Sequence, residues 1–206
     1  MGGDFMAVDK VILKAVCSTL ISIVLLFAFL FGSLCLFFPS TMMRFTYDLG
    51  MDESSVKFAT RAYKNSGEVY YIAYATEVSI GLGDADKIEK YGEKLLADEK
   101  FGAYCEMRNQ SLPEDTTMTY EQYVYGQVCM ALYEQGKKAE AVERAFELIG
   151  NTFPKNNAAA AVLLAALRAQ DTETVELIKG KMLAIGNGLQ GEDKTYYDAI
   201  LALING

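Results

Sequence analysis

The side chains that most often carry out catalysis are scarce in this sequence. Histidine is absent, which removes the commonest general base and the commonest metal ligand. The stretch GLGDAD, residues 81–86, lacks the third glycine of a dinucleotide-binding loop and follows a helical pattern instead of a strand. Asp84 and Asp86 form an acid pair, but acids at a helix start more often cap the helix and complement its dipole. We therefore predict no enzymatic activity, no cofactor and no metal site.

The four cysteines do not have the spacing of a zinc site. Cys17 and Cys35 lie in an uncharged apolar segment, where a cysteine serves as a small apolar side chain. Cys105 and Cys129 lie in the more polar remainder of the chain. A disulfide between these two is permitted if that part lies outside the cytoplasm, and the sequence leaves both the paired and the free state open.

The uncharged segment covers residues 15–38 and is predicted to cross a membrane. Its 24 residues would form a helix about 36 Å long, enough for a hydrocarbon core of about 30 Å with some tilt. A cleaved signal peptide is the alternative. The apolar stretch is longer than a signal peptide needs, however, and no small-residue cleavage site follows it. The prediction is an uncleaved anchor in the cell membrane that contacts the lipid bilayer through residues 15–38.

The charges beside this segment indicate its orientation. Lys10 and Lys14 precede it, and Arg44 is the near cation after it. The positive-inside rule then places residues 1–14 in the cytoplasm as a short N-terminus and the C-terminal domain on the extracytoplasmic side. Beyond residue 14 the chain holds 25 acidic and 17 basic residues, a net charge of −8. Such a surface excludes nucleic acid as a favourable partner.

Beyond the anchor the apolar residues recur at helical spacing, without sustained alternation, so the fold class is all-α. Turn signals are centred on Gly50, Gly83, Gly136 and Gln170, at separations of 33, 53 and 34 residues. The middle separation becomes 34 if residues 98–117 contain a 19-residue insertion. This period predicts helix–turn–helix repeats. Residues 39–66 would hold connecting helices and a first degenerate repeat, and residues 67–206 the main repeat domain.

Residues 123–148 carry the strongest repeat signal. Tyr125 and Gly136 match an aromatic position and a turn, and the remaining matches are apolar or small residues: Val128, Cys129, Leu132 and Ala141. This stretch resembles a tetratricopeptide repeat. Ala145 is smaller than the residue usual there. In the preceding unit Gly92 replaces a large residue, and in the following unit Lys179 does not fit.

The resemblance implies an α-solenoid in which neighbouring hairpins share one core. The stretch GEDKTYYDAILALI near the C-terminus would form a capping helix. The resemblance also implies a concave surface lined by the first helix of each repeat. The partner-binding residues would lie on this surface: Tyr70, Glu77, Tyr123, Met130, Tyr133, Asn157 and Arg168. Tyrosine and arginine suit binding surfaces. The competing interpretation is that most of these tyrosines fill the core. The insertion 98–117 is a second candidate surface.

Two functions fit these features. The first is a membrane-anchored interaction scaffold that binds a protein or peptide partner at the extracytoplasmic membrane face. The second is a structural or accessory subunit of a larger membrane complex, held mainly through its transmembrane helix. In that case the small residues of the span would be contact points between helices: Ser18, Ser22, Gly32 and Ser33.

Overall fold

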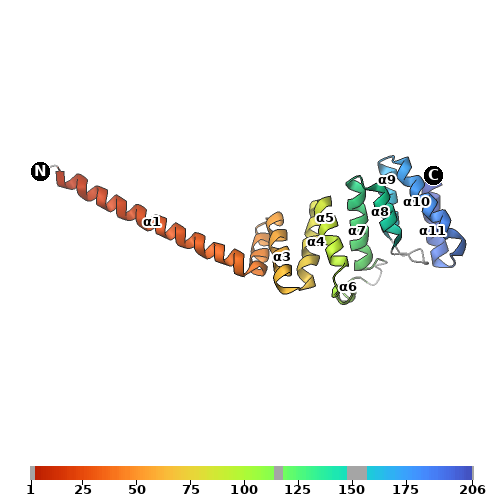
Figure 1. The fold of residues 1–206 in the computed structure, drawn as a ribbon, viewed down its shortest axis with the longest axis horizontal. Coiled ribbons are helices and arrows are strands. Elements are labelled where there is room, and N and C mark those ends of the chain that lie inside the picture. The colour runs from red at the N-terminus through yellow and green to blue at the C-terminus, as the bar shows by residue number, and fades with distance from the viewer. Residues whose placement is uncertain (1–2, 114–117, 148–156, 206) are drawn as a thin grey trace. The chain divides into compact units, whose positions relative to one another are not determined.

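The computed structural model describes residues 3–113, 118–147 and 157–205. Every regular element in this part of the chain is helical, as Figure 1 shows, so the predicted all-α class is confirmed. The chain divides into two compact units, residues 1–65 and residues 66–206, which are treated separately below.

The first unit begins with the long helix α1 (Gly3–Phe37). Within it, Ile12–Phe37 is long and apolar enough to cross a membrane. The hydroxyls of Thr19 and Ser22 donate to the carbonyls of Ala15 and Ser18, each at 2.9 Å, so these polar groups are satisfied inside the helix. Such internal bonding is what a helix in lipid requires.

Helix α1 ends at Phe37, one residue before the end of the predicted span of residues 15–38. Phe38 has φ −127° and ψ 57°, outside the helical region. Helix α2 (Pro39–Asp48) starts directly after it, with proline in the first turn. The cause is steric, because proline disfavours a helical conformation in the residue before it and suits the first helical position.

Helices α2 and α3 (Asp52–Ser66) complete the first unit, and α2 packs against α1. Their buried side chains are small or flexible: Met42, Met43, Thr46, Ser55, Val56, Ala59 and Ala62. Arg61 of α3 donates to the carbonyl of Cys35 at 3.3 Å, which ties α3 to the last turns of α1.

The second unit is a series of helices in contact with their neighbours (Figure 1). In chain order they are α4 (Val69–Leu82), α5 (Ala85–Leu96), α6 (Phe101–Asn109), α7 (Tyr120–Glu134), α8 (Lys138–Glu147), α9 (Asn157–Arg168), α10 (Thr172–Ile185), a 3-10 turn (Gly186–Gly188) and α11 (Glu192–Asn205). Helix α7 packs against α5, α8 and α9, and α10 packs against α8, α9 and α11. Consecutive helices thus pack against each other within a hairpin and also against the helices of the next hairpin.

The four residues expected at the turns share one backbone conformation. Gly50, Gly83, Gly136 and Gln170 have φ values of 68°, 65°, 79° and 54°, in the left-handed region. Gln170 is the one residue other than glycine with positive φ in the described part of the chain. These turns join α2 to α3, α4 to α5, α7 to α8 and α9 to α10.

The hydrogen bonds of the four turns are equivalent as well. At the third turn, Gly136 N–H donates to the carbonyl of Tyr133 at 2.9 Å, and Lys137 N–H donates to that of Leu132 at 3.0 Å. The other three turns have the same pair of bonds, reaching back three and five residues. This is the Schellman arrangement, which satisfies the last carbonyls of a helix.

The core of the second unit runs through several helices. Buried side chains of α7, α8, α9, α10 and α11 form one apolar cluster, which includes Tyr125, Leu132, Leu163, Met182 and Ile200. Five of the positions that carry the repeat resemblance in residues 123–148 are buried here, and the turn residue Gly136 is exposed: the buried ones are Tyr125, Val128, Cys129, Leu132 and Ala141. In α11, Tyr197 and Ile200 are buried whereas Leu203 is exposed, so one face of this helix covers the cluster.

The predicted insertion at residues 98–117 contains the helix α6. Phe101, Tyr104 and Cys105 form a buried face on it, and α6 contacts α4 and α7. Residues 114–117 lie outside the described part of the chain. Cys105 and Cys129 are both buried free thiols, so no disulfide joins them in this structure.

Candidate functional site

Helices α4, α6 and α7 surround an open hollow of about 400 Å³ in the second unit. We call it the α4–α6–α7 cavity. The residues that line it are Glu77, Arg108, Leu112, Met118, Thr119, Tyr120 and Tyr123. They lie on α4, α6 and α7, except for three residues between α6 and α7: Leu112, Met118 and Thr119.

The start of α7 is held by a capping box. Thr119 Oγ1 accepts from the N–H of Gln122 at 3.2 Å, and Gln122 Oε1 accepts from the N–H of Thr119 at 3.0 Å. Asn109, the last residue of α6, accepts from the N–H of Tyr120 at 2.8 Å. These bonds satisfy N–H groups that a helix start leaves unpaired, and they place Tyr120 and Tyr123 next to α6.

A polar cluster forms one wall of the cavity. Glu77 Oε1 accepts from the Tyr120 hydroxyl at 2.7 Å and from Arg108 Nη2 at 2.9 Å. The Arg108 guanidinium lies 5.0 Å from the centre of the Tyr120 ring, within range of a cation–π interaction. One carboxylate therefore connects α4, α6 and α7.

Burial and the Glu77 carboxylate raise the pKa of Tyr120 well above its ordinary value. Burial raises the pKa of Tyr123 too, with Glu77 as a second cause. Both tyrosines stay protonated at neutral pH, because the anion is disfavoured by low dielectric and by a neighbouring negative charge. Neither is activated as a base or a nucleophile. Among the described residues no cluster of three potential metal ligands occurs.

The structure brings together only some of the predicted partner-binding residues. Glu77 and Tyr123 line the α4–α6–α7 cavity. Tyr70 does not line it, and its exposed ring packs edge-on against Tyr71, with 5.5 Å between the ring centres. Met130 is partly buried on α7, and Arg168 is exposed at the end of α9. The side chain of Asn157 lies outside the described part of the structure.

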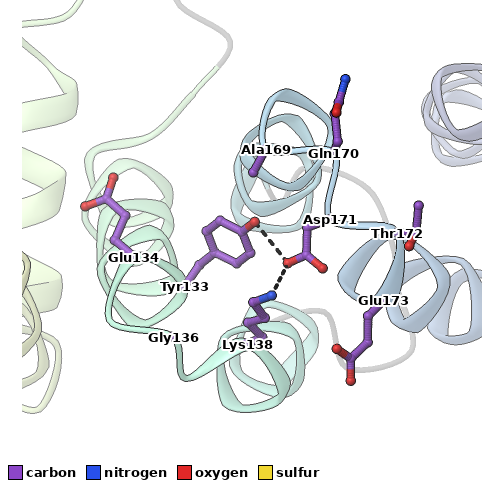
Figure 2. Close-up of a pocket in the computed structure, with 9 residues that line it drawn as sticks. All are labelled: Tyr133, Glu134, Gly136, Lys138, Ala169, Gln170, Asp171, Thr172 and Glu173. Atoms are coloured by element: carbon purple, nitrogen blue, oxygen red, sulfur yellow. Dashed lines mark hydrogen bonds and ion pairs between the residues drawn. The ribbon is translucent and has the colours of Figure 1, made fainter.

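Tyr133 lies in a second, wider hollow of about 640 Å³, between the α7–α8 and α9–α10 turns (Figure 2). Its hydroxyl donates to Asp171 Oδ2 at 3.1 Å, and Lys138 Nζ lies 2.8 Å from the same oxygen. Asp171 also caps α10 by accepting from the N–H and hydroxyl of Thr174. Because these polar groups bind one another, the arrangement serves to join two turns.

None of the three predicted partner-binding tyrosines is fully buried: Tyr70 is exposed, and Tyr123 and Tyr133 are partly buried. Other tyrosines fill the core. Tyr104, Tyr120, Tyr125 and Tyr197 are buried, and the hydroxyl of Tyr125 donates to the carbonyl of Arg144 at 2.8 Å. Tyr120 is buried in the core and also lines the α4–α6–α7 cavity.

Sequence reasoning missed Tyr120 and Arg108. Thr119 followed three residues later by Gln122 is a capping-box signal. It predicts a helix start at Tyr120, with Tyr120 and Tyr123 on one face. Nothing local pointed to Arg108, which meets Glu77 across 31 residues of sequence.

No protein-family model, curated protein or solved structure matches this chain.

Proposed function

We propose that this protein is a membrane-anchored interaction scaffold. Helix α1 anchors it in the cell membrane, with the C-terminal domain on the extracytoplasmic side, and the second unit binds a segment of a partner protein. The observation that carries the proposal is the α4–α6–α7 cavity, whose lining combines apolar side chains with tyrosines and a carboxylate. Such a lining recognises a ligand by contact area and hydrogen bonds.

The helical hairpins of the second unit form a tetratricopeptide-like α-solenoid in this proposal. Support comes from the turns at Gly83, Gly136 and Gln170, which share their φ region and their hydrogen bonds. It also comes from the contacts of α7 with the hairpins before and after it. In a repeat array the first helices of successive hairpins line one surface, and α4 and α7 contribute Glu77, Tyr120 and Tyr123 to the cavity lining.

The cavity suits a peptide segment with an apolar side chain. Leu112 and Met118 offer apolar contact next to the rings of Tyr120 and Tyr123. Glu77 has 35% of its side chain exposed, so its carboxylate can accept from a partner's backbone amide or ammonium group. The Tyr123 hydroxyl, whose pKa is raised, can donate to a partner at neutral pH, whereas the Tyr120 hydroxyl already donates to Glu77.

Affinity capture from native membranes tests the proposal. Full-length protein carrying Tyr123→Ala should recover much less of its partner than the unmodified chain, while its circular dichroism is unchanged. Leu183→Ala is the matched control, because Leu183 is an exposed residue of α10 that does not line the cavity. Equal recovery by all three proteins would show that this cavity is not the binding site.

The accessory-subunit function is the second candidate. It is favoured by one observation: the apolar window of α1 has no residue buried against the rest of the described chain. All its sides are therefore available to another helix or to lipid. Replacing Ser18, Ser22 and Gly32 by leucine should abolish capture if small residues form the contact, and should leave it intact if the cavity binds the partner.

A further inference from the structure

Large apolar side chains are exposed where α1 gives way to α2. Phe38 is 56% exposed, Phe45 50% and Leu49 58%. Phe45 and Leu49 are four residues apart, so they fall on one face of α2 and its C-terminal end, and Phe38 lies at the junction directly before this helix. We call these three exposed residues the α2 strip.

The α2 strip is separate from the core of the first unit. Met42, Met43 and Thr46 form the inward face of α2, with exposed fractions of 4% or less. The Thr46 hydroxyl donates to the carbonyl of Met42 at 2.7 Å, so the inward face is also satisfied in its hydrogen bonds. The strip is therefore an outer surface with no described partner in its own unit.

The connection to α1 limits how far the strip can lie from the end of the span. Phe38 is the one non-helical residue between α1 and α2. Helix α2 has 10 residues, about 15 Å at the rise of an α-helix, so the strip lies within roughly that distance of Phe37. Contact of α2 with α1, and the bond from Arg61 to the Cys35 carbonyl, hold this part of the unit at the end of the span.

The charge of this segment also suits a lipid surface. Residues 39–51 contain one cation, Arg44, and one anion, Asp48, whereas the whole chain has a net charge of −8. Arg44 and the 54%-exposed Tyr47 are residue types that favour the boundary between headgroups and acyl chains.

We propose that α2 lies in the interfacial layer of the membrane, with Phe38, Phe45 and Leu49 inserted among the lipids. The inference rests on the proposed membrane anchoring and deepens it. The anchor then has two parts, a span and an interfacial helix at its end. An interfacial helix binds by burying its apolar face at the boundary of the acyl chains.

The chain contains no tryptophan, so a single introduced tryptophan is a unique fluorescent reporter. The experiment uses full-length Phe45→Trp reconstituted in phosphatidylcholine vesicles. Part of the lipid carries bromine either near the headgroup end of the acyl chains or near the bilayer midplane, and acrylamide is added as an aqueous quencher. Leu25→Trp reports on α1, and Leu183→Trp, on exposed α10, is the water-phase control.

The proposal predicts that Phe45→Trp loses most of its emission to the shallow bromine, much less to the deep bromine, and little to acrylamide. Leu25→Trp should respond most to the deep bromine, and Leu183→Trp to acrylamide. If Phe45→Trp behaves like Leu183→Trp while Leu25→Trp is quenched by lipid, α2 is not interfacial and the anchor stands. If neither is quenched by lipid, the anchoring itself is wrong.

Leu49→Trp is a second reporter on the same strip. It should give the same depth as Phe45→Trp, which guards against a local disturbance by either substitution. Quenching of Leu49→Trp by acrylamide and not by shallow bromine would overturn the proposal.

Discussion

Gly92 on α5 approaches Val128 on α7 so closely that a β-carbon at Gly92 would lie 2.3 Å from Cγ2 of Val128. Both residues are buried. The repeat resemblance predicts a large residue at this position, which Gly92 does not provide. In the structure, the absence of a side chain at Gly92 leaves room for the branched side chain of Val128.

Gly92→Ala should therefore destabilise the protein. Alanine gains up to about 1 kcal/mol over glycine in a helix interior. Overpacking a core costs about 1–3 kcal/mol, and the stiff χ1 of buried Val128 cannot yield easily. The expected net loss is about 1 kcal/mol, measured by urea unfolding of the protein in detergent.

Gly180→Ala is the control for this prediction. Gly180 lies inside α10, and a β-carbon there would meet nothing within 4 Å. This substitution should stabilise the protein by about 0.5–1 kcal/mol. Adding Val128→Ala to Gly92→Ala should relieve the clash, so the two substitutions should combine non-additively. A stabilising Gly92→Ala would contradict the packing described.

Gln170 has the backbone conformation that glycine has at Gly50, Gly83 and Gly136. A residue with a side chain destabilises the folded state by about 1–2 kcal/mol in the left-handed region. Glycine removes this cost, but it offsets part of the gain because it increases the conformational entropy of the unfolded chain. Gln170→Gly should raise the free energy of unfolding by up to about 1 kcal/mol. In contrast, Ala169→Gly, one residue earlier, should lower it. Thermal unfolding monitored by circular dichroism compares the two, and equal effects would mean that the strain at Gln170 is absent.

The charge on Asp171 should stabilise the fold in a pH-dependent way. The hydrogen bond from Lys138 is the main cause that lowers its pKa below the ordinary value, with help from Thr174. A carboxyl whose folded pKa is lowered contributes stability above its unfolded pKa of about 3.9, and loses it as the pH falls through the folded value.

Asp171→Asn isolates this effect, because asparagine can still cap α10. The variant should unfold at lower urea than the unmodified protein at pH 7, and the difference should shrink below about pH 4. Thr172→Ala, at the exposed next position, is the control and should show no such pH dependence. A difference that is constant from pH 7 to pH 3 would exclude the charge as its cause.

Burial raises the pKa of Cys105 to about 12 and that of Cys129 to about 12. At pH 8 almost no thiolate forms at either site, and the thiolate is the reactive species. A maleimide should therefore leave both cysteines unmodified in the native protein and modify both in urea, as mass spectrometry of peptides would show. Rapid native modification of Cys129 would mean that α7 is not packed as described.

A structural feature of this protein can be predicted from the sequence when the residues that cause it are close together in the chain. The turns at Gly50, Gly83 and Gly136 were found because a left-handed residue after a helix strongly favours glycine. The turn at Gln170 follows from its 34-residue separation from Gly136, because glutamine, unlike glycine, does not itself favour the left-handed region. The long apolar helix within α1 is predictable because an uncharged run of this length is a local feature of the sequence, and α1 ends at Phe37, directly before the Phe38–Pro39 step.

The sequence does not predict the cavity, because the contacts that form it are not local. Two residues that line it, Glu77 and Tyr123, are predicted from their repeat positions to lie on a concave surface. Helix α6 was missed because its buried face has only Phe101, Tyr104 and Cys105 in a short, otherwise polar segment. Helix α6 brings Arg108 to Glu77. A repeat pattern in the sequence does not predict contacts between an inserted segment and the helices before it.

The most direct test of the scaffold function is photocrosslinking from Tyr123 in native membranes. A benzophenone amino acid replaces Tyr123 in the full-length chain, and a parallel chain carries it at Leu183. The account predicts a discrete protein adduct from position 123 that is lost when Glu77→Gln is added, and no such adduct from position 183. No adduct from position 123, or the same adduct from both positions, would contradict it.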